Sequence, residues 1–310
     1  MLVWAFGSLD AQYYNVTNKH ARSYLTLSAG GGVHLQMGES ERIKAAPGAA
    51  AQAAFSYEVQ TRRFFFNIGV GADWNMLSPE LKEMTDSYLR ADRDGRPIRY
   101  DYSYSDYRET QQAVYASVPI QFGFLLTDNI YLALGVKASY PLYTHYAVST
   151  DLYTGGTYLQ LIEAVQRNVP SYGFYPEATY RYEGTYANAP LYVTPGFEAG
   201  ALLPISKRVS CRIGAYCEYG IPIPLNERTP DLDLIDYSAV DLSPQTQSQQ
   251  NLQDNLRFNS LSDSHFNASV ADYGGTDAMQ QVAQKLTVGV RCTFRFDVTP
   301  VVHTCMCLKY

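Results

Sequence analysis

The stretch from Tyr24 to Leu35 reads YLTLSAGGGVHL, and its side chains fall into two unlike rows when the sequence is read two residues at a time. One row is apolar and holds Leu25, Leu27, Ala29, Gly31, Val33 and Leu35. The other is polar or small and holds Tyr24, Thr26, Ser28, Gly30, Gly32 and His34. Strict alternation of this kind is typical of an extended strand with one apolar face.

Seven further stretches follow the same rule, at residues 48–59, 63–74, 113–124, 130–140, 191–201, 209–219 and 285–296. Their apolar rows contain no Asp, Glu, Lys or Arg, whereas their polar rows carry both acids and bases. A charged side chain that faces lipid costs about 2–4 kcal/mol, so a bilayer would impose this exclusion. The pattern predicts an all-β, antiparallel, up-and-down transmembrane barrel of eight strands, apolar outside and polar inside.

Two alternatives share the alternation. A count of ten strands would require further strands within the long connections. A soluble lipocalin-like barrel or a sandwich would place the apolar face inside. The membrane barrel is favoured because aromatic residues gather at the strand ends, short and long connections alternate, and many inward residues are small enough for a narrow interior.

The connections predict the orientation and the boundaries. Short turns are expected at residues 60–62, 127–129 and 206–208, and long extracellular loops near 38–47, 77–110, 144–190 and 221–284. Short turns are periplasmic in such barrels, so both termini should be periplasmic. Residues 1–11 are interpreted as a clipped signal peptide, 12–298 as the barrel, and 299–310 as a periplasmic tail that includes Cys305 and Cys307.

Some local expectations follow from spacing. Residues 157–169 have helical spacing, and residues 178–185 alternate like a strand. Pro119 and Pro195 fall inside predicted strands, where each removes a ladder hydrogen bond, so a bulge or a local break is expected at each.

Composition excludes two classes of protein. No run of about 18 uncharged apolar residues exists to form a membrane-spanning helix. The net charge of −6 leaves no basic stripe for phosphates, so nucleic acid is excluded as a partner. The 27 tyrosines suit β-structure and membrane interfaces.

Two sets of candidate site residues emerge. Charged residues on the inward rows must find partners, because unpaired charge inside a protein is costly. The predicted network of ion pairs in the lumen comprises Glu58, Arg63, Asp73, Lys137, Glu198, Arg212, Glu218, Arg291 and Arg295. The second set lies in the second long loop, where tyrosine alternates with Asp and Ser in a composition suited to recognition, and comprises Tyr100, Tyr102, Tyr104 and Tyr107.

Candidates for catalysis and metal binding are sparse. His34, and His145 with Ser149 and Asp151, offer the residue types of a rim triad, but no spacing ties them together. Acidic residues at 92–94 and 231–241 do not match a calcium loop. We therefore predict no catalytic residue, no cofactor and no metal site.

Several segments resemble small outer-membrane β-barrels of Gram-negative bacteria, the group that includes the OmpA transmembrane domain. They are VYASVPIQFGF at 114–124, ALGVKASYP at 133–141, RIGAYCEYG at 212–220 and LTVGVRCTFRF at 286–296. Phe296 would be the terminal aromatic that such barrels use in assembly, although this chain continues beyond it. The resemblance does not extend to the peptidoglycan-binding domain of longer relatives, so we do not expect from it a role in anchoring to the cell wall.

The resemblance implies a location in the bacterial outer membrane, in contact with lipid and lipopolysaccharide. It is a poor guide to activity, because one fold hosts many functions. We expect a structural or surface-recognition role, adhesin-like or as a subunit of a membrane complex, with loops that contact an extracellular protein or carbohydrate. The alternatives are a narrow pore or accessory transport subunit and, third, a lipid-modifying enzyme.

Overall fold

The computed structural model describes residues 21–37, 43–44, 47–81, 84–91, 95–158, 164–167, 169, 174–187, 189–223, 225, 234–236, 256–263 and 284–299. The predicted signal peptide and the Cys305 and Cys307 pair lie outside these residues. Within them, no helix has the length and apolar character needed to cross a membrane.

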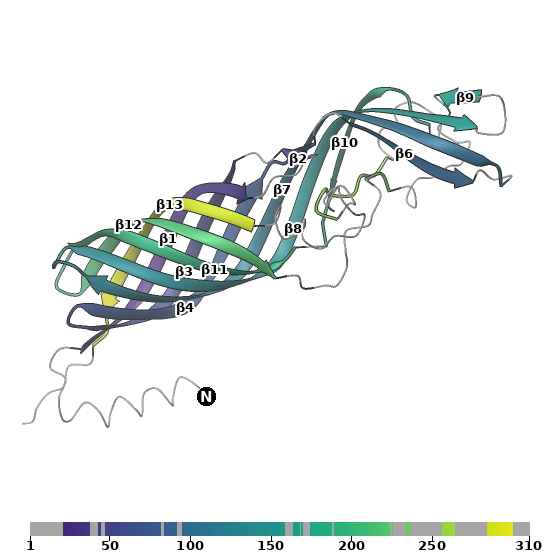
Figure 1. Cartoon of the computed structure of the whole chain (residues 1–310). Helices are drawn as coiled ribbons and strands as arrows, with labels where there is room; N and C mark the ends of the chain where they lie inside the picture. The colour runs from purple at the N-terminus through teal and green to yellow at the C-terminus, as the bar shows by residue number, and fades with distance from the viewer. Residues whose placement is uncertain are drawn as a thin grey trace, which may run out of the picture.

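Eight long strands form a closed ring, as Figure 1 shows. Each is antiparallel to its neighbours, and the last pairs with the first, with Leu25 opposite Phe296 and Leu35 opposite Leu286. The predicted eight-stranded up-and-down barrel is confirmed. In the order of the ring the strands are β1 (Ala21–Met37), β3 (Gly48–Thr61), β4 (Phe64–Leu77), β7 (Pro97–Leu125), β8 (Ile130–Tyr158), β11 (Leu191–Pro204), β12 (Val209–Ile223) and β13 (Gln284–Asp297).

Three short turns close one end of the ring, which we call the turn end. They join β3 to β4, β7 to β8 and β11 to β12, at the three predicted positions. The first contains Arg62 in the left-handed region, with a φ of 52°, as tight turns often require. The opposite end, from which the long connections leave, is called the arm end.

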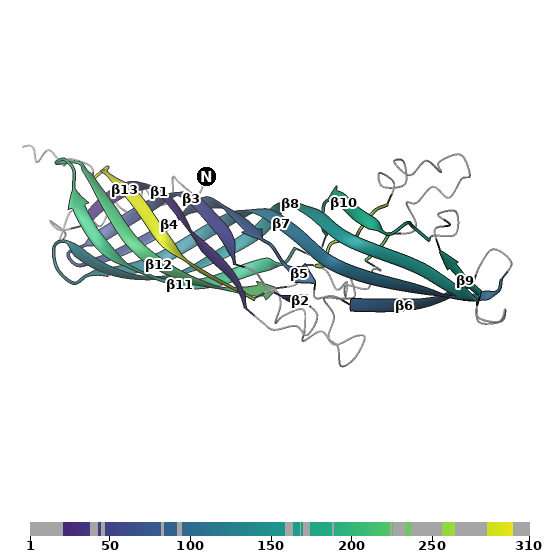
Figure 2. The ribbon, with the colours of Figure 1, turned by 90° about the horizontal axis from the view of Figure 1, so that it is seen from above.

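The two 29-residue strands β7 and β8 continue together beyond the ring and form an arm, which Figure 2 shows from above. We define the arm as residues 97–110 and 144–158 with the strands paired to them. About fourteen extended residues span roughly 45 Å. The paired strands are β6 (Met84–Ala91) on β7, and β9 (Ala164–Arg167) and β10 (Ala178–Gly184) on β8, with two-residue β5 (Glu80–Leu81) and β2 (Ile43–Lys44) at its base.

The arm corrects the prediction that residues 77–110 and 144–190 are simple loops. Most of their described residues are strands, because mutual pairing satisfies backbone hydrogen bonds that a loop would leave to water. The strand expected at 178–185 is confirmed as β10. The helical spacing at 157–169 was misleading, since its described residues lie mainly in β8 and β9, and short apolar runs fit either period.

The two faces of the ring are occupied as predicted. The outward side chains of Leu134, Val290 and Val118 are 64%, 57% and 46% exposed, whereas the inward Arg212 is 2% exposed. Apolar side chains therefore cover the outer surface of the ring, and ionic side chains line its interior.

The two prolines inside strands act as the sequence predicts. Pairing of β4 with β7 is interrupted between Ile68–Ile120 and Gly71–Ser117, around Pro119. Pairing of β11 with β12 is interrupted between Val193–Ile221 and Gly196–Glu218, around Pro195. The register is unchanged across both gaps, so each proline causes a local break and not a bulge.

Two bulges govern which side chains are buried in the arm. One lies on β7 between Ser105 and Arg108, with Asp106 at a φ of 49°. The other lies on β8 near Leu142. Each inserts one extra residue and so reverses the parity of the buried positions. The face that lines the ring interior thereby continues as the buried face of the arm.

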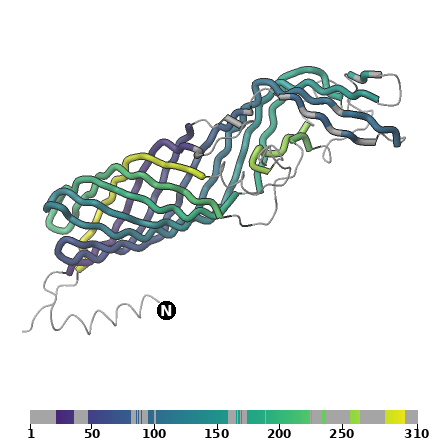
Figure 3. The backbone as a smooth tube through the Cα atoms, viewed as in Figure 1, coloured from purple at the N-terminus to yellow at the C-terminus, as the bar shows by residue number. Residues whose placement is uncertain are grey.

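That buried face carries its own apolar core, which we call the arm core. Parts of the last long connection, residues 234–235 and 256–261, pack against the strands and are joined by a bridge between Ile235 and Phe258. Figure 3 shows residues 256–263 in light green beside β8 and β10. The arm core comprises Tyr102, Tyr104, Tyr107, Tyr146, Val148, Leu152, Tyr175, Tyr180, Leu234, Ile235, Leu256, Phe258 and Leu261.

Candidate functional site

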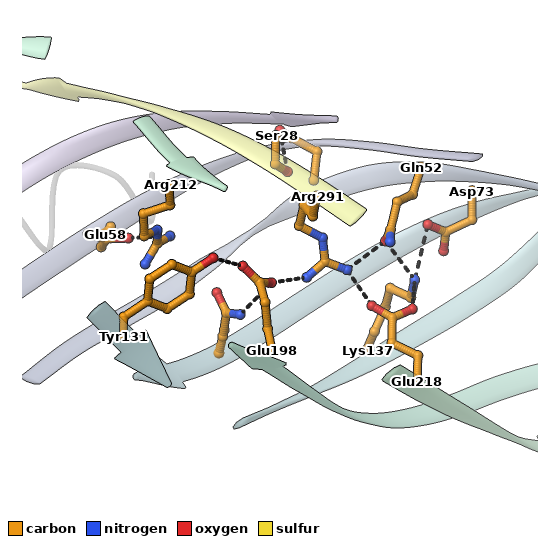
Figure 4. Close-up of polar contacts among 12 residues, drawn as sticks. Ser28, Gln52, Glu58, Asp73, Tyr131, Lys137, Glu198, Arg212, Glu218 and Arg291 are labelled. Atoms are coloured by element: carbon orange, nitrogen blue, oxygen red, sulfur yellow. Dashed lines mark hydrogen bonds and ion pairs between the residues drawn. The ribbon is translucent and has the colours of Figure 1, made fainter. Parts of the chain in front are cut away.

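The interior of the ring holds two groups of ion pairs, which together we call the inner network and which Figure 4 draws in part. Every second residue of a strand points inward, and six strands contribute residues to this network: β3, β4, β8, β11, β12 and β13. The structure brings together eight of the nine predicted residues, namely Glu58, Asp73, Lys137, Glu198, Arg212, Glu218, Arg291 and Arg295.

Near the turn end, the fully buried carboxylate of Glu58 lies between two guanidinium groups. Its oxygens are 2.8 Å from Arg212 and 2.6 Å from Arg295. Arg295 also donates to Gln60 at 2.5 Å, and the guanidinium of Arg212 lies over the ring of Phe65 at 4.2 Å from its centroid. One carboxylate thus compensates two buried cations, helped by an aromatic face.

In the middle of the ring, Arg291 and Lys137 are each held by two carboxylates. Arg291 lies 2.7 Å from Glu198 and also contacts Glu218. Lys137 lies 2.8 Å from Glu218 and 3.2 Å from Asp73. These shared partners make a continuous chain of charges across the interior, which stiffens the ring as long as every member is paired.

Neutral side chains complete this chain, and sequence reasoning did not include them in the network. Gln52 accepts from both Lys137 and Arg291, at 3.2 and 2.9 Å. Tyr131 and Gln121 donate to Glu198 at 2.5 and 3.2 Å. All three lie on inward rows, so the alternation places them inside the ring. They were not predicted as members because only charged residues were considered.

Arg63 does not belong to the inner network, and its inclusion was wrong. It is an exposed residue of the turn between β3 and β4. The strand pairing ends at Thr61 and Phe64, so the alternation that would point Arg63 inward does not extend to it.

The space left inside the ring is small. Two cavities among the inner side chains measure about 60 and 20 Å³. One water molecule occupies about 10–15 Å³ of such a cavity, so the smaller cavity has room for one water and the larger for a few. An eight-stranded ring is expected to be filled by side chains, and the inner network fills this one.

The tyrosines proposed for recognition occupy a different environment from the one expected. Tyr102, Tyr104 and Tyr107 are buried in the arm core and do not form an exposed loop surface. The bulge at Asp106 explains this, because it turns Tyr107 to the same side as the two even-numbered tyrosines. The side chain of Tyr100 lies outside the described residues, so its recognition role stays a prediction.

The histidines do not assemble a triad with Ser149 and Asp151. His34 is buried inside the ring, where its Nδ1 lies 3.0 Å from Thr287 Oγ1. His145 stacks on Tyr143 on the outer side of β8, four residues from Ser149 along the strand, which is about 13 Å. Among the described residues, no group of His, Cys, Asp or Glu could hold a metal ion.

A second buried carboxylate joins the arm to the last long connection. Glu109 accepts hydrogen bonds from the Tyr107 hydroxyl at 2.9 Å and the Gln111 amide at 2.7 Å. It also accepts from the Ser260 hydroxyl at 2.5 Å and the Leu261 backbone N–H at 2.8 Å. A single side chain of β7 therefore holds a segment that is about 150 residues away in the chain.

This carboxylate predicts a pH dependence of the contact. Burial raises the pKa of Glu109 above its ordinary value of 4.5, although its four hydrogen bonds oppose the rise. A raised folded-state pKa favours folding below the unfolded pKa, and the contribution is lost as pH rises through the folded value. The protection factor of the Leu261 amide against hydrogen exchange should fall from pH 4 to pH 8.

The matched variants for this test are Glu109→Gln and Glu183→Gln. Glu109→Gln should flatten the pH dependence, because the side chain no longer titrates. Glu183→Gln, which changes an exposed carboxylate on β10, should leave it intact. Equal pH dependence in wild type and Glu109→Gln would contradict the assignment.

Comparison with known proteins adds no family to this geometry. No protein-family model matches the chain, and no curated protein matches it significantly.

Proposed function

We propose that this protein is a bacterial outer-membrane barrel of the small OmpA-type group, in which the arm is a rigid extracellular platform for surface recognition. The platform would act as an adhesin or as a subunit of a membrane complex. The observation that carries the proposal is a change of polarity along the outer face of one pair of continuous strands, β7 and β8.

On the ring part of β8, the outward residues Leu134 and Val136 are apolar and exposed. Farther along the same strand, beyond the bulge near Leu142, the corresponding row holds Ser149 and Asp151. Apolar side chains move from the exposed face in the ring to the buried face in the arm. Lipid around the ring would account for the exposed apolar side chains there, and water around the arm would account for their burial in the arm core.

Aromatic side chains at both ends of the ring support the proposal that each end lies at a membrane–water interface. Six phenylalanines on outward positions gather at the turn end, and Trp74, Tyr140 and Tyr219 lie on outward positions at the arm end. Aromatic belts of this kind lie at the level of lipid headgroups. The turn-end residues are Phe64, Phe66, Phe122, Phe124, Phe294 and Phe296.

The orientation follows from the turns. Short turns and both described chain ends lie at the same end of the ring, which we assign to the periplasm. The arm then extends outward from the cell surface, past the headgroups of lipopolysaccharide.

The outer face of the arm is the surface that we assign to recognition. It is mainly polar and formed by paired strands, so its backbone is held in place and loses little conformational entropy on binding. Arg108 and Arg181 are both exposed there and flank Ser149 in register. A protein or carbohydrate with acidic groups is the partner that this pair favours.

The test compares whole cells that display wild type with cells that display Arg108→Glu/Arg181→Glu, on arrays of surface proteins and acidic glycans. We expect at least one array ligand to bind wild type and to lose about tenfold in affinity with the double variant. A variant with Lys207→Glu, in a turn at the other end of the ring, should bind as wild type. Absence of wild-type binding, or equal binding by all three, would contradict recognition by this face.

A narrow pore is the second candidate, because the interior of the ring contains two cavities and charged side chains line both of them. The inner network instead predicts that purified protein in a planar bilayer carries no steady unitary current. Lys137→Ala/Arg291→Ala, which removes both doubly paired cations, should raise the frequency of brief openings. A stable wild-type conductance that scales with salt concentration would favour the pore.

A further inference from the structure

Exposed basic side chains gather at the turn end of the ring. They lie on the first residues of β1 and on the turns that join β3 to β4 and β11 to β12. In the order of the ring, these elements occupy one continuous arc that runs from β11 through β13 and β1 to β4. We call this set the basic arc, and it consists of Arg22, Arg62, Arg63, Lys207 and Arg208.

Acidic groups on the surface of the turn end do not balance the basic arc. Asp128 is exposed in the turn between β7 and β8, outside the arc. Asp297 is partly buried, and its carboxylate accepts a hydrogen bond from the Thr299 backbone N–H at 2.9 Å. Within the part of the chain that the structure describes, no side chain of the basic arc forms an ion pair. The arc therefore presents its positive charge to its surroundings.

A surplus of buried positive charge lies just inside the basic arc. The carboxylate of Glu58 is shared by Arg212 and Arg295, so this group of ion pairs carries one net positive charge. The Nε and Nη1 atoms of Arg212 are buried and have no hydrogen-bond partner among the described residues. A buried charge is screened less by salt than an exposed one, so the surplus adds to the positive potential of the turn end.

The basic arc adjoins the apolar surface of the ring. Phe64, a member of the aromatic belt at the turn end, directly follows Arg63 in the chain. The turn that carries Lys207 also carries Ile205, which is 59% exposed, and the next turn around the ring carries Leu126, which is 45% exposed. Long basic side chains can lay their aliphatic stems on such a surface while their charges reach the polar layer beyond it. Apolar and basic groups are thus combined at one edge, as the edge of a lipid leaflet requires.

We propose that the basic arc binds the headgroups of anionic phospholipids, with its guanidinium groups paired to the phosphodiester oxygens. This inference rests on the proposed function, because it needs the turn end to lie in a lipid leaflet. Guanidinium groups bind phosphate through two parallel hydrogen bonds, and basic clusters beside a membrane span recognise anionic lipid. A zwitterionic headgroup offers the same phosphate but carries an ammonium group that the arc repels. An acidic protein fits less well, because the bases lie directly beside the apolar belt.

Electron spin resonance of spin-labelled lipids gives the direct test. The protein is refolded into phosphatidylcholine vesicles that contain a trace of phosphatidylglycerol or phosphatidylcholine with a nitroxide near the end of one acyl chain. The fraction of label that contact with the protein slows is then measured. At low ionic strength we expect wild type to prefer phosphatidylglycerol about fivefold, the effect of one base per headgroup, and added salt should reduce the preference.

Two matched triple variants locate the effect. Replacing three arginines of the basic arc should abolish most of the preference, whereas replacing three exposed arginines on the arm side of the ring should retain it. The variants are Arg62→Gln/Arg63→Gln/Arg208→Gln and Arg99→Gln/Arg167→Gln/Arg257→Gln.

The slowed fraction of labelled phosphatidylcholine shows that each protein is inserted, so a folding failure is recognised. Equal slowed fractions for the two lipids in wild type, or an equal loss of preference in both triple variants, would overturn the inference and leave the proposed function standing. Absence of any slowed lipid around wild type would refute the membrane barrel and the inference with it.

Discussion

Replacing Glu58 with glutamine will lower the free energy of unfolding by about 3–5 kcal/mol, which is the cost of leaving a buried charge without its partner. Glu58 is fully buried and is the carboxylate that both Arg212 and Arg295 contact. Glutamine keeps the size of the side chain but removes the negative charge, so two guanidinium groups would face each other without compensation. Urea unfolding of protein refolded into lipid vesicles measures the change.

The control for this variant is Glu183→Gln, which alters an exposed carboxylate on the arm and should leave the unfolding free energy essentially unchanged. The triple variant Glu58→Leu/Arg212→Met/Arg295→Met removes the carboxylate and both guanidinium groups. It should recover much of the unfolding free energy that Glu58→Gln loses. If Glu58→Gln unfolds like wild type, the paired charges contribute little to the stability of the ring.

Placing arginine at position 134 will cost about 2–4 kcal/mol of stability in a bilayer, because a charge would then face hydrocarbon. Leu134 is 64% exposed on the outer side of β8, so the change creates no cavity and breaks no internal contact. Arginine at Ala147, on the outer side of the same strand in the arm and opposite Glu183 in register, should be neutral because that position would face water.

The comparison of these two arginine variants uses vesicle refolding and urea unfolding under the same conditions. Equal stabilities for Leu134→Arg and Ala147→Arg would remove the argument for lipid around the ring. A loss confined to position 134 would support it.

The ring could be predicted from sequence because its chemistry repeats. A strand with one apolar and one polar face has a period of two, and eight such stretches separated by alternating short and long connections leave few other arrangements. Leu25 and Phe296 illustrate this, since each lies on the outward row expected for it and the two are paired in the closed ring.

The arm could not be predicted in the same way because its strands contain bulges. Tyr104 and Tyr107 are both buried, although strict alternation would place them on opposite faces. The extra residue at Asp106 reconciles them, and a bulge has no reliable sequence signal of its own. The core also depends on residues 256–261, a contact across about 150 residues of chain that spacing does not reveal.

The inner network was largely predictable, and its errors have physical causes. Inward charge in a narrow ring must be paired, which identifies Glu58, Lys137 and Arg291. Arg63 failed because β4 begins one residue after it, and Gln52, Gln121 and Tyr131 were missed because they carry no charge. Pairing depends on registers between strands, and one sequence does not specify those.

The most direct test of the central claim measures which solvent surrounds each half of β8. Nitroxide labels would be attached to cysteine at Leu134 or Ser149, with the five native cysteines changed to alanine, in protein refolded into lipid vesicles. We predict that the label at 134 collides mainly with molecular oxygen, which concentrates in hydrocarbon, and the label at 149 mainly with a water-soluble nickel complex. Preferential collision of the label at 134 with the nickel complex would contradict the account.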